Sequence, residues 1–105
     1  MPIQLTVMER RDNADRRELG NTALQLCRII RRRDGITSSK FYWYWTDTIV
    51  VVTEGETAAL DAPGTAAPEE YARAGFALAD MARRVMNWRL AEPRAGEETY
   101  RRAGR

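Results

Sequence analysis

The sequence predicts an α+β domain in which an antiparallel sheet is covered by two helices on one face. Three observations predict it: two adjacent runs rich in aromatic and β-branched residues, an alternating apolar run near the start, and two segments with apolar residues at helical spacing. Along the chain these segments follow the order strand, helix, strand, strand, helix. We place the domain in residues 1–90 and expect residues 91–105 to be a polar C-terminal tail.

The central feature of the sequence is a predicted hairpin over residues 40–54. Two apolar runs flank the polar pair Thr46-Asp47, which we take as a two-residue turn. With that turn, one face carries Phe41, Trp43, Trp45, Thr48, Val50 and Val52, and the other carries Tyr42, Tyr44, Ile49 and Val51. Both faces are apolar. Because the helices cover one face, with Trp43 beneath them, the other face requires a ligand or a second subunit.

The first strand and the first helix precede the hairpin. Apolar and polar residues alternate over residues 3–8, which predicts a strand. A helix follows, capped by Asn13 or Asp15 and ended by Asp34-Gly35. A right-handed crossover would then place the first strand parallel to and beside one strand of the hairpin.

A second helix is predicted from Pro68 to about Leu90, because Pro is tolerated in the first turn and apolar residues follow at helical spacing. Its expected buried stripe is Tyr71, Ala74, Leu78, Met81, Ala82 and Val85. Residues 57–68 before it are rich in Ala, Thr, Gly and Pro, and predict a loop with a short turn of helix near its start. A fourth strand is expected only as a short piece within residues 88–94 or in the tail.

The charge pattern gives no nucleic-acid signal. With 17 basic and 15 acidic residues, the formal net charge of +2 is smaller than the surplus that phosphate binders usually concentrate on one surface. Residues 3–8 and 48–53, the strands that carry stacking aromatics in RNA-recognition modules, contain no aromatic residue. Arg28 and the run Arg31-Arg32-Arg33 form either an anion-binding patch or, as is more usual, a solvated helix end. We expect no nucleic-acid partner.

The residue inventory also limits the chemistry and the location. The single Cys27 forms no internal disulfide, and no apolar run approaches the roughly 20 residues of a membrane span. We therefore expect a cytoplasmic protein with no membrane partner. The chain contains no His, which removes the commonest general base and the usual ligand of zinc and haem. We expect neither a metal nor another cofactor.

The order of elements, the length and the aromatic strand at residues 41–45 resemble the dimeric α/β-barrel group of ferredoxin-like proteins, which includes antibiotic-biosynthesis monooxygenases. The resemblance covers about residues 2–90. It implies a homodimer in which the open face of each sheet packs on the other subunit and closes a dimeric α/β barrel around a small hydrophobic or aromatic molecule. It also implies, for an enzyme, oxidation of an aromatic substrate without metal or flavin, in which the substrate's own carbanion reacts with oxygen.

The candidate ligand-binding residues are Gln4, Thr6, Tyr42, Tyr44 and Trp88. The two tyrosines would hydrogen-bond a substrate oxygen in a cavity on the open face of the sheet, and Trp88 with Asn87 would close its mouth. Alternatively, the tyrosines belong to a subunit interface, and Asn87-Trp88 caps and packs the end of the second helix. No individual residue is assigned a catalytic step beyond positioning by the tyrosines.

Two other functions remain open at this point. Met-Pro before a strand and a helix also resembles the 4-oxalocrotonate tautomerase superfamily, in which an amino-terminal proline acts as general base. Pro2 would take that role, and Arg10 or Arg11 with Lys40 would hold a dicarboxylate substrate. The third alternative is a dimeric interaction module without catalytic activity.

Overall fold

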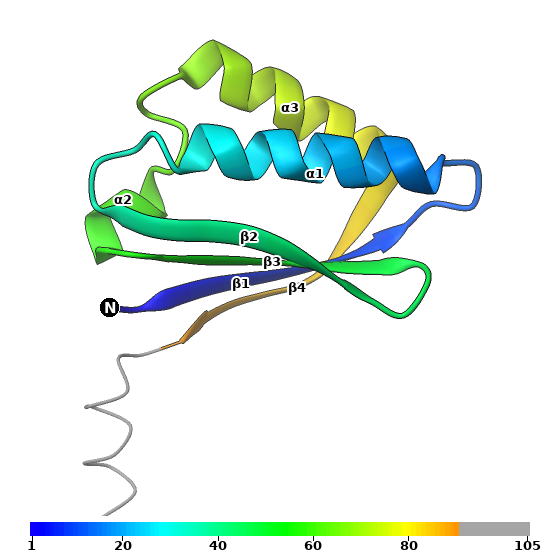
Figure 1. The fold of residues 1–105 in the computed structure, drawn as a ribbon, viewed down its shortest axis with the longest axis horizontal. Helices are drawn as coiled ribbons and strands as arrows, with labels where there is room; N and C mark the ends of the chain where they lie inside the picture. Colours follow the sequence, from blue (N-terminus) through cyan, green and yellow to red (C-terminus); the bar gives the residue numbers. More distant parts are fainter. Residues whose placement is uncertain (91–105) are drawn as a thin grey trace, which may run out of the picture.

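Four antiparallel strands form a sheet in the order β2-β3-β1-β4, and the helices cover one of its faces (Figure 1). The computed structural model describes residues 1–90, and the predicted tail, residues 91–105, lies outside the described residues. The elements are β1 (Ile3–Arg10), α1 (Arg16–Ile30), β2 (Ile36–Tyr44), β3 (Thr48–Gly55), α2 (Thr57–Asp61), α3 (Pro68–Met81) and β4 (Ala82–Leu90). This is the ferredoxin-like α+β fold that the sequence predicts.

Strand β1 lies inside the sheet and runs antiparallel to both of its neighbours, β3 and β4. The prediction that the first strand lies parallel to and beside a hairpin strand is therefore wrong. Strand β3 lies between β1 and β2 and is antiparallel to each, so β1 is parallel only to β2, one strand away. The connection through α1 thus passes over β3.

Residues 82–90 form strand β4, and the prediction that the second helix continues to Leu90 is wrong. Helix α3 ends at Met81, and the backbone of Ala82 is already extended, with φ −145° and ψ 150°. The apolar residues of β4 that share one face alternate along it: Met86, Trp88 and Leu90. Val85, which the helical stripe would include, lies where the pairing of β4 with β1 shifts register at a β-bulge. The bulge interrupts the alternation, so the strand resembles a helix in sequence.

The hairpin between β2 and β3 has the three-residue loop 45–47 instead of a two-residue turn. Trp45, the first residue of this loop, lies in the left-handed region of the backbone, with φ 63°, which few residues other than glycine adopt. One extra loop residue shifts the face that each side chain of β3 occupies. Ile49 and Val51 therefore face the helices, and the prediction that they share a face with the tyrosines of β2 is wrong.

The hydrophobic core lies between the sheet and helices α1 and α3. Its buried residues include Met8, Leu19, Ala23, Leu26, Ile29, Ile49, Val51, Ala74 and Leu78. Helix α1 begins where predicted, because the side chain of Asp15 accepts a hydrogen bond from the backbone N–H of Arg17 at 2.9 Å. Trp43 packs against this core, as predicted, and the guanidinium of Arg16 lies 4.0 Å from its ring centre.

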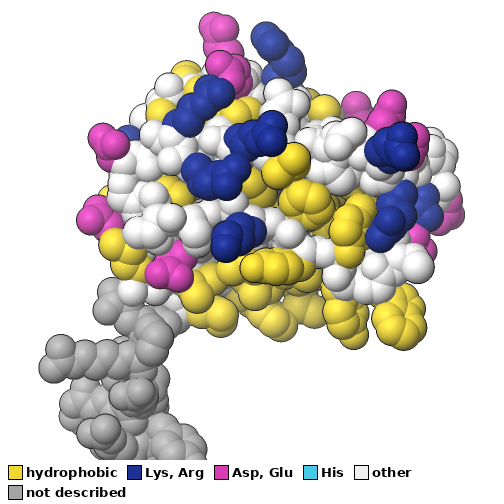
Figure 2. Space-filling view, viewed as in Figure 1, with side chains coloured by type: hydrophobic (Ala, Val, Ile, Leu, Met, Phe, Trp, Pro, Cys, Tyr) yellow, Lys and Arg dark blue, Asp and Glu magenta, His cyan; other side chains and the backbone are white. Residues whose placement is uncertain are grey.

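The opposite face of the sheet carries no described helix and gathers exposed apolar side chains (Figures 1 and 2). The aromatic residues there are Tyr42, Tyr44 and Trp88, whose exposed fractions are 55%, 68% and 52%. In Figure 2 this face is at the bottom of the molecule, where hydrophobic side chains form a nearly continuous surface. We call it the open face and define its centre as Leu5, Val7, Tyr42, Val50, Val52, Met86 and Trp88, which share one side of the sheet by strand alternation and register.

We predict that Gly55→Ala destabilises the fold by about 1–3 kcal/mol. A Cβ atom at Gly55 would lie 2.5 Å from the carbonyl oxygen of Gly35 and 3.0 Å from the Cα of Ile36, and both are backbone atoms. Urea unfolding measures the effect. The control is Gly75→Ala, whose Cβ meets nothing within 4 Å, so its helix should keep or gain stability. Equal stability of the two variants would contradict the close approach at Gly55.

Candidate functional site

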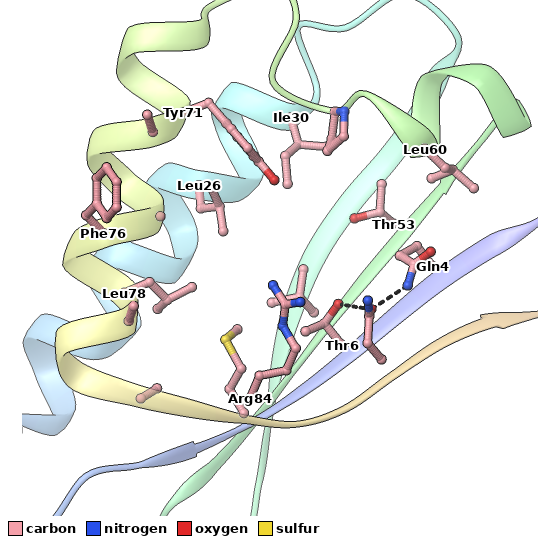
Figure 3. Close-up of a pocket in the computed structure, with 18 of the residues that line it drawn as sticks. Gln4, Thr6, Leu26, Ile30, Thr53, Leu60, Tyr71, Phe76, Leu78 and Arg84 are labelled. Carbon is pink, nitrogen blue, oxygen red and sulfur yellow. Dashed lines mark hydrogen bonds between the residues drawn. The ribbon is translucent and has the colours of Figure 1, made fainter.

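A cavity of about 670 Å³ lies between the sheet and helices α1 and α3 (Figure 3). Its helical side is largely apolar and includes Leu26, Ile30 and Leu78. Its polar lining comes mainly from the sheet and consists of Gln4, Thr6, Thr53, Arg84, Asn87 and Arg89, with Asp61 and Tyr71 added by α2 and α3. An apolar space of this volume with a few converging polar groups is the usual form of a small-molecule site.

Asn87 is the centre of the polar wall. Its side-chain oxygen Oδ1 accepts hydrogen bonds from Gln4 Nε2 and from Thr6 Oγ1, the latter at 2.9 Å (Figure 3). The sheet brings these groups together, because Thr6 on β1 pairs directly with Asn87 on β4. Both bonds use the oxygen, so the two N–H groups of the Asn87 amide have no hydrogen-bond acceptor within residues 1–90.

Arg89 extends this network toward α2. Its Nε donates to Gln4 Oε1 at 2.7 Å, and its Nη2 donates to Asp61 Oδ1 at 2.9 Å. A guanidinium that bonds an amide oxygen through Nε and a carboxylate through Nη2 is held in one orientation. The result is a continuous chain of hydrogen bonds from Asp61 through Arg89 and Gln4 to Asn87.

Arg84 and Tyr71 complete the polar lining. The guanidinium of Arg84 extends from β4 into the space between α3 and the sheet, and the hydroxyl of Tyr71 points into the same space from α3 (Figure 3). In the described part of the chain Arg84 forms no ion pair, whereas Arg89 is paired with Asp61. Arg84 is exposed to solvent at the edge of the cavity, and its positive charge has no ion-pair partner within residues 1–90, which favours a ligand that carries or develops negative charge.

The structure brings together two of the five residues predicted to bind a ligand. Gln4 and Thr6 line the cavity, but Tyr42, Tyr44 and Trp88 lie on the open face, on the other side of the sheet. Side chains of a strand alternate between faces, so Gln4 and Thr6 point toward the helices and their neighbours point away. The prediction that Gln4, Thr6, Tyr42 and Tyr44 point into one cavity on the open face is therefore wrong.

Sequence reasoning missed most of the polar lining. It considered Asn87 either at the mouth of a cavity on the open face or as a helix cap, and it gave no site role to Arg84, Arg89, Asp61 or Tyr71. The signal that would have found two of them is the alternation of Asn87 and Arg89 with apolar residues in β4, which marks them as one face of a strand. Asp61 and Tyr71 reach the cavity only through tertiary packing.

The residues proposed for a tautomerase do not converge. The carbonyl of Pro2 accepts a hydrogen bond from the backbone N–H of Gly55 at 3.3 Å, and Pro2 does not line the cavity. Arg10 lies at the far end of β1, roughly 26 Å away at the usual rise of a strand, and pairs with Asp47 at 2.7 Å. Arg11 follows it, and Lys40 lies on the open side of β2. No cation of this set is placed to hold a substrate at Pro2.

Cys27 is buried in α1 and packs in the core. Burial raises the pKa of its thiol, and a hydrogen bond with Ser39 and the positive charge of Arg31 only partly offset that rise. A thiol that stays protonated is a weak nucleophile. We therefore assign Cys27 a packing role.

Other predicted features have plain structural outcomes. Arg32, in the basic run after α1, pairs with Glu70 on α3 at 2.9 Å, and both side chains are exposed, as at a solvated helix end. Within residues 1–90, no group of three or more His, Cys, Asp or Glu side chains is placed to hold a metal ion. No helix described here has the length and apolar character needed to span a membrane.

The comparisons with known proteins find likeness in structure alone. No protein-family model matches the sequence, and no curated protein does. SnoaB, a cofactor-independent oxygenase from Streptomyces nogalater, has a TM-score of 0.74 at 8% identity, over 87% of this chain and 91% of that one. A protein from Mycobacterium tuberculosis has a TM-score of 0.70 at 20% identity, over 88% of this chain and 95% of that one.

A third structure, an antibiotic biosynthesis monooxygenase, has a TM-score of 0.68 at 16% identity and is covered over its full length, against 89% of this chain. At these identities the likeness establishes the fold. The chain therefore has the ferredoxin-like fold of the antibiotic-biosynthesis-monooxygenase structures, as the resemblance in sequence pattern implied.

Proposed function

We propose that the cavity binds a small, planar, hydrophobic or aromatic molecule with an oxygen acceptor, and that the protein oxidises it with O₂ without metal or flavin. The observation that carries the proposal is the cavity itself, in which Arg84 and the N–H groups of Asn87, which have no acceptor within residues 1–90, face apolar residues of the helices. Its fold is shared with SnoaB, a cofactor-independent oxygenase, which supports the same chemistry.

The proposed chemistry needs groups that stabilise negative charge on oxygen. A ring methylene conjugated with a carbonyl gives up a proton to solvent and becomes an enolate, whose oxygen would face Arg84 and Asn87. The carbanion carbon gives electrons to O₂ and, after protonation, becomes a hydroperoxide. Loss of water then leaves a second carbonyl, so R₂CH₂ and O₂ yield R₂C=O and H₂O. The substrate is the only reductant in this balance.

We predict that the protein accelerates oxidation of anthrone to anthraquinone, and that Arg84→Met lowers the rate by about a hundredfold, the usual effect of losing one group that stabilises an oxyanion. Oxygen uptake and anthraquinone absorbance measure the reaction, with ¹⁸O₂ to trace the new oxygen. The matched control is Arg83→Met, because Arg83 is adjacent on β4 but pairs with Glu9, outside the cavity.

The outcomes separate binding from catalysis. If the protein bound anthrone but did not accelerate its oxidation, the proposed oxidation would be contradicted. The protein would then be interpreted as a small-molecule binding protein without catalytic activity. Absence of both binding and oxidation would contradict the whole proposal. Equal loss of rate in Arg83→Met and Arg84→Met would contradict a specific role for Arg84.

We also propose that the open face packs on a second copy of the chain. A contiguous apolar surface that includes three exposed aromatic side chains is typical of an interface. By strand register, Glu54 lies at one end of this face, Glu9 lies at the other, and Lys40 lies on the edge strand β2. The apolar centre is thus bordered by charges of both signs, as is usual at the rim of an interface.

A further inference from the structure

We propose that Asp61, Arg89 and Gln4 set the hydrogen-bond polarity of Asn87, so that the cavity selects ligands with an acceptor oxygen over ligands of the same shape with a donor. The inference rests on the proposed function, because it assigns a specificity to the same cavity. Arg89 and Asp61 are positioning residues in this account, since they act on Asn87 only through Gln4.

Hydrogen bonds must set the orientation of Asn87, because the shape of an amide does not. The oxygen and the NH₂ group of an asparagine side chain have nearly the same size, so packing alone does not decide which one faces the cavity. The hydroxyl of Thr6, which bonds Asn87, can donate or accept, and the amide of Gln4 offers either group. Neither neighbour therefore fixes the orientation of Asn87 by itself.

Arg89 removes this ambiguity because a guanidinium only donates. Its bond at 2.7 Å requires the oxygen of Gln4 to face Arg89, which turns the Gln4 amide nitrogen toward Asn87. The oxygen of Asn87 must then face Gln4, and its two N–H groups are left for another acceptor. At Asn87 the wall of the cavity therefore presents hydrogen-bond donors to a ligand.

Asp61 orients Arg89, from which the series of hydrogen bonds leads to Asn87. Its carboxylate accepts from Arg89 Nη2 at 2.9 Å, while Arg89 Nε bonds Gln4. The two bonds use two nitrogens of one rigid, planar guanidinium, so each one orients the other. Asp61 ends α2, and this short helix thus contributes to ligand choice although its own carboxylate only accepts hydrogen bonds.

Three rigid tricyclic probes of nearly the same shape test the selection: 9-fluorenone offers a carbonyl acceptor, carbazole offers an N–H donor, and fluorene offers neither. We expect equilibrium dialysis to show that the wild-type protein binds fluorenone about five- to tenfold more tightly than carbazole, the worth of one hydrogen bond. Arg89→Met should bring that ratio close to one. Arg83→Met, the matched control on β4, should retain it, and Asp61→Asn should lower it by a smaller factor.

Gln4→Glu is the variant that most clearly separates the proposed control of amide orientation from a purely structural role. A carboxylate at this position still accepts from Arg89 but cannot donate to Asn87, so the Asn87 amide should turn its N–H groups toward residue 4 and its oxygen toward the cavity. The preference should then reverse, with carbazole bound more tightly than fluorenone. A purely structural role of Arg89 and Gln4 would weaken all three probes alike, and that result would overturn the proposal.

A measurement without ligand tests the chain directly. The sequence contains two Gln and three Asn, so the side-chain amide signals in a ¹⁵N NMR spectrum are few and assignable. We expect Arg89→Met to shift the amide signals of both Gln4 and Asn87, and Arg83→Met to shift neither. An unchanged Asn87 signal in folded Arg89→Met would overturn the proposal. If the wild-type protein bound none of the three probes, the proposed function would fail, and this spectrum would still decide the role of Arg89.

Discussion

Replacing Gly75 by tryptophan should lower the affinity for planar aromatic molecules by about tenfold or more while leaving the chain folded. Gly75 lies on α3 and lines the cavity, and within residues 1–90 a Cβ placed there would meet no atom within 4 Å apart from its chain neighbours and its own helix backbone. An indole at this position would therefore extend into open space and occupy room that a ligand requires. Equilibrium dialysis with 9-fluorenone measures the affinity, and a thermal melt verifies that the variant is folded.

Gly75→Ala is the matched control for this substitution. Its methyl group is too small to fill the cavity, so the affinity for fluorenone should stay within about twofold of wild type, while the helix gains the better propensity of alanine. If folded Gly75→Trp bound fluorenone as tightly as Gly75→Ala, the ligand would occupy another place on the molecule. The cavity between the helices and the sheet would then not be the site.

The second large effect concerns the open face. Val50 lies near the centre of this face, opposite Val7 on β1 and Tyr42 on β2, so no cation lies directly across from it. We expect the wild-type protein to be a dimer in analytical ultracentrifugation and Val50→Asp to be a monomer. An unpaired carboxylate in an apolar interface costs about 3–5 kcal/mol, which weakens association by several hundredfold or more.

The control for the interface is Leu24→Asp, because Leu24 is an exposed apolar residue of α1 and does not belong to the sheet. This variant should remain a dimer. A wild-type protein that sediments as a monomer at all concentrations would contradict the proposed interface. Dissociation of both variants would indicate that the helical side takes part in the contact.

The fold could be predicted from the sequence largely because the strongest signals were local. The cap at Asp15, the alternation in β1 and the two apolar runs of the hairpin each depend on neighbouring residues, and the structure confirms all three. The errors arose where one residue changes a register. Because the loop has one residue more than predicted, Trp45, the side chains of Ile49 and Val51 lie on the helical face. The bulge at Val85 gave the apolar residues of β4 a spacing like that of a helix.

The site was harder to predict than the fold because its residues come from distant parts of the chain. Gln4 and Thr6 were identified from the polar side of β1, but the cavity that they line is on the helical face and not on the open face where it was predicted. Their partner Asn87 is 81 positions from Thr6 in sequence, and the two meet only through the pairing of β1 with β4. Without β4, Arg84 and Arg89 had no assigned face. The exposed tyrosines then offered the stronger signal for a ligand, although they lie on the open face.

The measurement that tests the account most directly is a crystal structure of the protein with 9-fluorenone. We predict that the three rings lie between α3 and the sheet, and that the carbonyl oxygen accepts a hydrogen bond from the side-chain N–H of Asn87 or from Arg84. Fluorenone bound instead on the open face, against Tyr42 and Trp88, would contradict the assignment of the cavity as the functional site.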